Sequence, residues 1–273
     1  MIRVAGNLNY DGGVTKVNGA AYQDFAVTGG LHVYLGSGDD LFALGATGQL
    51  PTFKDVIIHM SEVNSNGSSD KDSVIIWGVT ATELLVNTST GNDTVFVSNA
   101  TITGGGYRYF QIDTGAGADE ITVTNSPNLN AYSAIYAGNS TENDVDKVRI
   151  NNVSVGDNCF LTVWLGGGDD ELYMTNVWVQ SDISIYAEGG NDKVELRTVT
   201  AVDELMASLG EGSDTLLLDD VHANTIRLTG EGGTDNLTKT NTTHNQLTLS
   251  GWEWINGTNW LANRVGTMAA TYR

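Results

Sequence analysis

A short phrase recurs along the whole chain, in which glycine-rich turn residues run through an aspartate into alternating apolar residues. It reads "GSGDDLFAL" at 36–44, "GAGADEITV" at 115–123, "GGGDDELYM" at 166–174, "EGGNDKVEL" at 188–196 and "GEGSDTLLL" at 210–218. Aligning all copies on the last aspartate of each phrase gives Asp40, Asp72, Asp93, Asp119, Asp146, Asp170, Asp192, Asp214 and Asp235. The spacings are 32, 21, 26, 27, 24, 22, 22 and 21 residues, so the repeat is about 24 residues long.

The residues after each aspartate test this alignment. The second and fourth are apolar in eight copies: Phe42/Leu44, Val74/Ile76, Val95/Val97, Ile121/Val123, Val148/Ile150, Leu172/Met174, Val194/Leu196 and Leu216/Leu218; the last copy has Leu237 and Lys239. Strict alternation predicts a strand with one buried face. A second strand precedes the turn, as in "LTVWLG" at 161–166.

A unit of about 24 residues cannot bury its apolar face alone, so the copies must stack. No helical period separates the strands, which argues against an array of βα units. We therefore expect an all-β fold, a right-handed parallel β-helix (β-solenoid) of about ten rungs. It should form one domain over residues 1–273, with an N-terminal rung or cap at 1–30, repeat rungs at 31–250 and a C-terminal cap at 251–273 containing Trp252, Trp254 and Trp260.

The sixth residue after the aspartate is polar in seven copies: Asn99, Asn125, Asn152, Asn176, Thr198, Asp220 and Asn241. The two early copies have Ala46 and Gly78. Stacked asparagines donate and accept hydrogen bonds along a column, which satisfies polar groups at a bend. In coil length and in this ladder, the chain resembles right-handed β-helix proteins of the pectate-lyase type.

Composition narrows the classes of function. The chain has 33 Asp and Glu against 13 Lys and Arg, a formal net charge of −20. This acidity argues against nucleic acid or an anionic membrane as partner, because both bind basic surfaces. The single Cys159 excludes an internal disulfide framework. No apolar run is long enough to span a membrane, and "MIRVAGNLNYDGG" shows no signal peptide.

The aspartate column has two interpretations. An aspartate after glycine in a tight turn accepts hydrogen bonds from backbone N–H groups, which needs no metal. Stacked copies, however, bring carboxylates about 5 Å apart, where like charges repel by about 3–4 kcal/mol at an effective dielectric of about 20. Calcium would neutralise them, using carboxylates and the carbonyl groups of a glycine-rich turn.

The phrases "GGGDDELYM" and "GEGGTDNLT" (230–238) resemble the hemolysin-type (RTX) calcium-binding repeat, although here the phrase occurs once per longer coil. The resemblance implies calcium as cofactor. The predicted metal ligands are Asp170, Asp192, Asp214 and Asp235, where the spacing is regular, with Asp40, Asp119 and Asp169. The copies "GSSDKDSV" at 67–74 and "NSTENDVDKV" at 139–148 lack the full glycine pattern and are weaker candidates.

Two rows of side chains are expected on the outer faces. The residue after the aspartate reads Glu120, Lys147, Glu171, Lys193 and Thr215 over five rungs, which predicts cross-strand ion pairs. Before the turn, Tyr34, Tyr136, Trp164 and Tyr186 point outward. An aromatic stripe of this kind either stacks on sugar rings or a partner surface, or forms a ladder that stabilises the sheet.

Two classes of function remain. We expect a non-catalytic, secreted or cell-surface module of a bacterium, stabilised by calcium and serving as a structural, adhesin or carbohydrate-binding segment. Its partners would be a polysaccharide or cell-surface glycan, or further copies joined end to end or side by side. No HExxH or GxSxG motif occurs, and the four histidines form no motif. The alternative is a polysaccharide lyase or glycoside hydrolase, which basic residues in a groove beside paired acids would favour.

Overall fold

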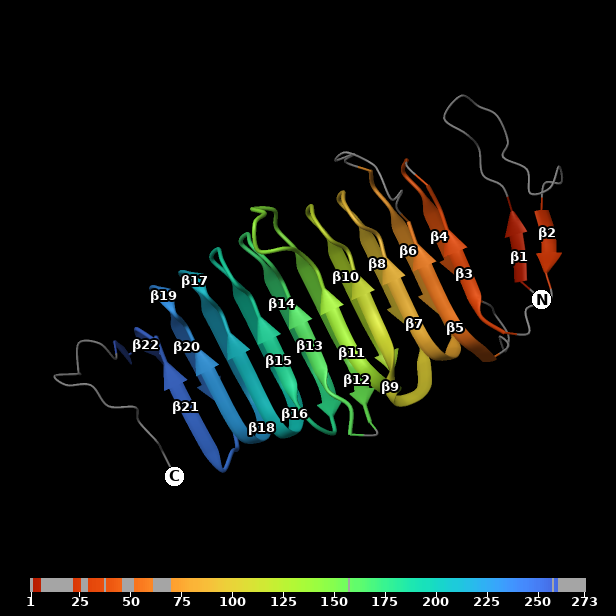
Figure 1. The fold of residues 1–273 in the computed structure, drawn as a ribbon. Coiled ribbons are helices and arrows are strands. Elements are labelled where there is room, and N and C mark those ends of the chain that lie inside the picture. The colour runs from red at the N-terminus through yellow and green to blue at the C-terminus, as the bar shows by residue number, and fades with distance from the viewer. Residues whose placement is uncertain are drawn as a thin grey trace.

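The chain forms a right-handed parallel β-helix of about nine turns in the computed structural model, which describes residues 2–5, 22–25, 29–36, 38–45, 52–60, 70–156, 158–256 and 258–259. The coils follow one another from β3 near the N-terminal end to β22 near the C-terminal end (Figure 1). No helix occurs among the described residues, and hence none long and apolar enough to cross a membrane. The expected fold class is confirmed.

Most strands lie either before or after the Gly-Asp turn. Those before it are β3 (Leu31–Tyr34), β5 (Thr52–His59), β7 (Thr80–Asn87), β9 (Thr101–Asp113), β11 (Asn128–Tyr136), β13 (Leu161–Trp164), β15 (Ile183–Tyr186) and β21 (Gln246–Ser250). Those after it are β4 (Leu41–Leu44), β6 (Ser73–Trp77), β8 (Thr94–Ser98), β10 (Glu120–Ser126), β12 (Lys147–Val155), β14 (Glu171–Val179), β20 (Asn236–Thr240) and β22 (Trp254–Ile255). The long strands β16 (Lys193–Ser208) and β18 (Thr215–Thr229) occupy both positions.

The remaining strands lie in turns or near the ends. Two short strands, β17 (Glu211–Gly212) and β19 (Gly232–Gly233), pair in parallel inside successive turns. Near the C-terminal end, β23 (Thr258–Asn259) folds back antiparallel on β22. Near the N-terminal end, β1 (Ile2–Ala5) and β2 (Tyr22–Phe25) pair antiparallel in a sheet of their own. The N-terminal rung over residues 1–30 stays a prediction.

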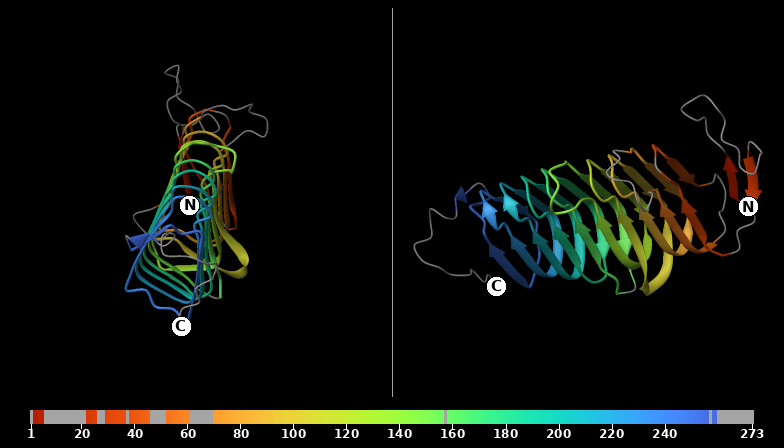
Figure 2. Two further views of the ribbon diagram at one scale, coloured as in Figure 1. Left: turned by 90° about the vertical axis from the view of Figure 1, so that its left-hand side faces the viewer. Right: turned by 45° about the horizontal axis from the view of Figure 1, so that its top comes forward.

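Each coil has three straight runs. In the coil that contains β16 they are residues 193–197, 199–201 and 204–208, and each pairs in parallel with the equivalent run of β18. Seen from the end of the stack, the coils lie one behind another (Figure 2, left). Because equivalent runs pair, a residue at one repeat position lies beside the same position of the next copy.

The predicted apolar columns form the core. Val95 lies beside Ile121, and Ile121 beside Val148. The second and fourth residues after the aspartate are buried in every copy from the second to the eighth. Phe42 at the N-terminal end is only half-buried, as is Lys239, where the alternation breaks. Each fully buried branched side chain contributes roughly 1.5–3 kcal/mol through the hydrophobic effect.

Trp252 occupies the core at the C-terminal end. Its side chain is buried, and its indole N–H donates a hydrogen bond to the carbonyl oxygen of Leu228 at 3.1 Å. Trp254 on β22 is exposed instead, and Trp260 lies outside the described residues. Trp252 therefore packs on the last apolar layer of the described residues. The predicted division into residues 1–30, 31–250 and 251–273 stays a prediction.

The bend between the first two runs has a fixed backbone conformation. The sixth residue after the aspartate has φ between 50° and 69° in the eight described copies. Glycine, asparagine and aspartate reach this left-handed region at low cost, which explains why they dominate the column. The amide group of Asn152 donates to Oδ1 of Asn125 at 3.0 Å, and that of Asn176 to Oδ1 of Asn152 at 2.7 Å. The predicted asparagine ladder is present, and Ala46 lies outside the described residues.

Thr198 is the one β-branched residue of this column, with φ 53°, and it should be strained. Replacing Thr198 with asparagine should remove the strain and extend the ladder beyond Asn176. We expect Thr198→Asn to stabilise the protein by about 1 kcal/mol, which raises Tm by about 2–4 °C. Thermal unfolding measures this. Thr175→Asn, on the extended strand one residue before the column in the preceding coil, is the control and should give no gain; an equal gain in both variants would contradict the explanation.

Candidate functional site

The repeat aspartates stand in one column at the glycine-rich corner. From Asp72 to Asp235 their side chains are buried, and Asp40 is half-buried. The backbone N–H of each aspartate donates to Oδ1 of the aspartate in the next coil, at 2.7–2.9 Å. The last, Asp235, donates to Oε2 of Glu253 at 2.8 Å. The column is therefore a continuous chain of amide-to-carboxylate hydrogen bonds that ends on a glutamate.

The second oxygen of the carboxyl groups, Oδ2, mostly lacks a hydrogen-bond donor. Oδ2 is buried and has no hydrogen-bond partner among the described residues in seven members of the column: Asp93, Asp119, Asp146, Asp170, Asp192, Asp214 and Asp235. Beside Asp93 and Asp119 stand the buried threonine hydroxyls of Thr88 and Thr114. A buried oxygen without a hydrogen-bond donor destabilises the folded state, and a bound proton or cation would relieve this.

Burial raises the pKa of the aspartates in this column. It brings the pKa to about 7 for Asp72, Asp170 and Asp214, to about 8 for Asp119 and Asp192, and to about 9 for Asp146. The pKa is also raised by burial for Asp40, Asp93 and Asp235. The hydrogen bond from the preceding coil lowers the pKa, and neighbouring carboxylates raise it further, but burial dominates.

Glycine stands two residues before the aspartate in seven of the nine copies, and Asp70 and Asp144 take that position in the other two. At Gly190 and Gly212, φ is 130° and 146°. A Cβ atom at Gly190 would lie 1.8 Å from the carbonyl oxygen of Gly168, and one at Gly212 would lie 1.6 Å from that of Gly190. Both contacts are far inside van der Waals distance, so no side chain fits.

Stacking also uses the carbonyl groups of the turns. Gly189 N–H donates to Gly166 O at 3.3 Å, Glu211 N–H to Glu188 O at 2.8 Å, and Gly190 N–H to Glu211 O at 2.8 Å. These oxygens are the ones that a glycine-rich turn would offer to calcium. In the regular corners, Oδ2 is therefore the least committed oxygen.

The structure brings six of the seven predicted metal ligands into the column: Asp40, Asp119, Asp170, Asp192, Asp214 and Asp235. Asp169 points outward, and its Oδ1 accepts hydrogen bonds from the backbone and side chain of Asn191 at 2.7 and 3.0 Å. No group of three or more His, Cys, Asp or Glu side chains in the described ranges is arranged to hold a metal. Calcium binding stays a prediction.

Sequence reasoning missed two glutamates that act on the column. Glu253 lies in the cap, beyond the last recognisable phrase. Glu142 lies in the turn whose glycine pattern is broken, and its charge raises the pKa of Asp119, Asp146 and Asp170. The available signal was an acidic residue at each place where the repeat departs from its pattern.

The predicted aromatic stripe consists of two stacks. The rings of Tyr136 and Trp164 lie 4.6 Å apart at 7°, and those of Trp164 and Tyr186 lie 5.2 Å apart at 12°. Tyr34 stacks on His59 at 5.0 Å and 12°. The rings cover one another's faces, so the geometry is that of a ladder between coils. Glycan binding by these residues stays a prediction.

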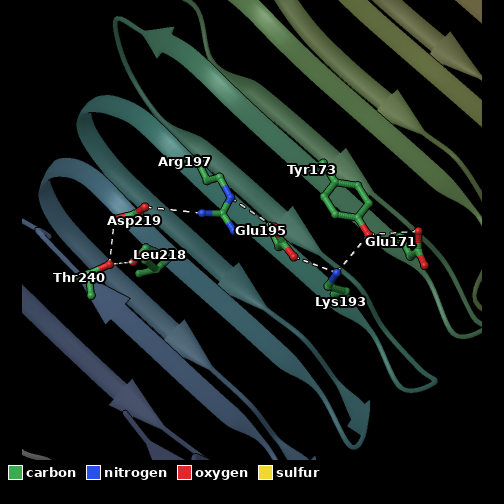
Figure 3. Close-up of polar contacts among 8 residues, drawn as sticks. All are labelled: Glu171, Tyr173, Lys193, Glu195, Arg197, Leu218, Asp219 and Thr240. Carbon is green, nitrogen blue, oxygen red and sulfur yellow. Dashed lines mark hydrogen bonds and ion pairs between the residues drawn. The ribbon is translucent and has the colours of Figure 1, made fainter.

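A chain of charged and polar side chains crosses the outer face of β14, β16, β18 and β20 (Figure 3). Lys193 contacts Glu195 at 2.8 Å and the hydroxyl of Tyr173 at 3.2 Å, and Arg197 joins Glu195 at 3.1 Å to Asp219 at 3.5 Å. On the preceding coils, Glu120 pairs with Arg149 at 2.6 Å, and Lys147 with Glu171 at 3.5 Å. Within the predicted row only Lys147 and Glu171 form an ion pair, because Glu120 pairs with Arg149 rather than with Lys147 beside it, and Lys193 pairs with Glu195 on its own strand rather than with Glu171.

Comparisons with protein-family models, with curated proteins and with solved structures gave no match. The fold is therefore established by the geometry, and the resemblance to the hemolysin-type repeat rests on the sequence pattern.

The raised pKa values predict how stability depends on pH. Because each folded pKa lies above the unfolded value of about 3.9, the folded state binds more protons between about pH 4 and pH 9. Stability should therefore fall as pH rises through this range. Without divalent cations, we expect Tm to be several degrees higher at pH 5 than at pH 8.5.

Two variants separate the column from the general negative charge. Asp192→Asn keeps an acceptor for the Asp170 N–H and cannot ionise, so it should raise Tm at pH 8.5 and change it little at pH 5. Asp203→Asn removes one charge from an exposed position and should change neither value. A Tm that rises from pH 5 to pH 8.5 in EGTA, or equal effects of both variants, would contradict the analysis.

Proposed function

We propose that this chain is a non-catalytic β-helix module that acts outside a bacterial cell as a structural, adhesin or carbohydrate-binding segment, with calcium ordering its Gly-Asp corner. The proposal rests on one observation, which is that the regularly repeated side chains contact neighbouring coils. The aspartate column, the asparagine ladder, the aromatic stacks and ion pairs such as Lys147–Glu171 connect one coil to the next. Polar groups that connect each coil to the next are expected to make the β-helix a stiff rod.

The buried carboxylates support the calcium part of the proposal. Like charges in one column repel, and each proton lost as the pH rises increases that repulsion. A calcium ion takes oxygen ligands and neutralises two carboxylates at once. Extracellular modules bind calcium with Kd of about 0.1–1 mM, which suits a protein outside the cell.

The basic side chains of the outer face bear on the enzyme alternative. Lys147, Arg149, Lys193 and Arg197 lie on a sheet face, and each is paired with a carboxylate. A lyase that acts on uronates needs positive charge facing its acidic substrate. The described cations of this face are neutralised by their neighbours, which supports the non-catalytic proposal.

One observation favours the alternative. His222 contacts Oδ1 of Asp220 through Nε2 at 3.2 Å and Oγ1 of Thr243 through Nδ1. His222 and Thr243 line an open hollow of about 360 Å³. A carboxylate, an imidazole and a hydroxyl in this order resemble the groups of nucleophilic hydrolysis. If the chain is a polysaccharide-degrading enzyme, His222 is the first residue to replace.

Thermal unfolding in calcium, in magnesium and in EGTA tests the proposal. At a calcium concentration of about 100 Kd, binding to the folded state alone should raise Tm by roughly 5–10 °C, and magnesium should raise it less. The same preparation should leave neutral and acidic polysaccharides uncleaved. Equal effects of the two ions, or none, would remove the calcium part; cleavage that His222→Ala abolishes would establish the enzyme instead.

A further inference from the structure

The turn between Ala137 and Asp146 differs from its neighbours. It spans residues 138–145, whereas the next turn spans only 166–169. The additional residues bring half-buried Glu142 back to the corner, where its Oε1 accepts a hydrogen bond from Asn139 N–H. Its Oε2 accepts from Gly117 N–H at 3.1 Å and from the side chain of Asn139 at 3.3 Å. A carboxylate outside the repeat pattern is thus held in place beside the column.

Three oxygen atoms converge beside Gly138. A Cβ atom on that glycine would lie 1.9 Å from Glu142 Oε1, 2.4 Å from the carbonyl oxygen of Leu165 and 2.6 Å from Asp146 Oδ2. Because all three oxygens lie within 2.6 Å of that one point, any two of them are at most about 5 Å apart. Ligands at about 2.3–2.6 Å from one calcium ion lie up to about 5 Å apart, so one ion can contact all three.

The second observation concerns Asp146 itself. Its side chain is 0% exposed, its Oδ1 accepts from Asp119 N–H at 2.7 Å, and its Oδ2 has no partner among the described residues. That unpaired oxygen faces a second carboxylate and a carbonyl group, which are both acceptors. Burial raises the pKa of both Asp146 and Glu142, as expected where carboxylates gather without a counter-charge.

We propose that Glu142, Asp146 and the carbonyl oxygen of Leu165 form a dedicated site for one divalent cation of the size of calcium. The all-oxygen ligand set, which includes a carbonyl group, suits calcium better than magnesium. An open hollow lined by Ser140, Glu142, Gly167 and Gly190 lies beside these residues and gives access to water. The site rests on the proposed calcium binding for the identity of the ion, and it places the ion in the turn that lacks the glycine pattern.

Regular corners lack the second carboxylate. The corner of Asp192 is the closest comparison, because Glu188 lies in its turn. That glutamate is exposed, and its carbonyl oxygen pairs with Glu211 N–H at 2.8 Å. Glu188→Gln is therefore a matched control, since it removes the same charge from the same kind of turn without touching the three oxygens.

Calorimetric titration of the intact chain with calcium, supported by terbium luminescence, tests the site. The wild type and Glu188→Gln should show the same tightest site, and Glu142→Gln should weaken it at least tenfold. Gly138→Ala, which keeps both carboxylates but fills the point where the oxygens converge, should weaken it similarly. Without calcium, in EGTA, Tm of Glu142→Gln should be no lower than that of the wild type, because the variant removes a repulsive charge beside the column; this excludes misfolding as the cause.

The outcomes separate this site from the broader proposal. If Glu142→Gln binds calcium as tightly as the wild type while calcium still raises Tm, the site is wrong and calcium stabilisation stands. If the wild type binds no calcium at millimolar concentration, the site and the calcium part of the proposed function both fail. The non-catalytic assignment depends on neither result.

Discussion

The hydrogen bond from one aspartate amide to the carboxylate of the next coil is the interaction on which the corner depends. Turns that stack at the strand spacing of about 4.8 Å leave little room between them. Glycine removes the Cβ atom that would strike the carbonyl group of the preceding turn, as at Gly212. The tight turn also leaves an amide without a strand partner, and the aspartate supplies its acceptor. Glycine and aspartate therefore recur together because one permits the stacking and the other satisfies it.

This solution has an electrostatic cost. Each carboxyl group must enter the corner to reach the amide, and burial then disfavours its charged form. One oxygen gains a donor and the other loses water. The same feature that holds the coils together thus makes the column sensitive to protons and cations. Exposed acids outside the column, such as Glu120 and Glu188, are screened by water instead.

Much of this arrangement could be predicted from residue spacing. Alignment on the aspartates placed the apolar columns in register, because stacking repeats every position, and it placed the polar sixth residue at a bend. The outward direction of Asp169 could not be predicted, because this residue lies in a bend, where side chains do not alternate as they do along a strand. Nor could the link from Asp170 N–H to Asp192 Oδ1, because the spacing does not say which coil a side chain leans toward. The role of Glu253 could not be predicted either, because this glutamate accepts the hydrogen bond of the Asp235 N–H although it lies beyond the last recognisable phrase.

The glutamate of the longer turn shows where such reasoning fails. A repeat alignment gives weight to copies that match, so it ranked the turn around Glu142 among the weaker metal candidates. In the regular copies of a solenoid, side chains contact their equivalents in neighbouring coils, as Asn152 contacts Asn125 and Trp164 contacts Tyr186. Where the pattern is interrupted, a side chain has no equivalent in the next coil to contact, so it is free to face a ligand. Binding function in a β-helix should therefore be sought at departures from the repeat, and the regular copies supply the rigid frame that holds those departures in place.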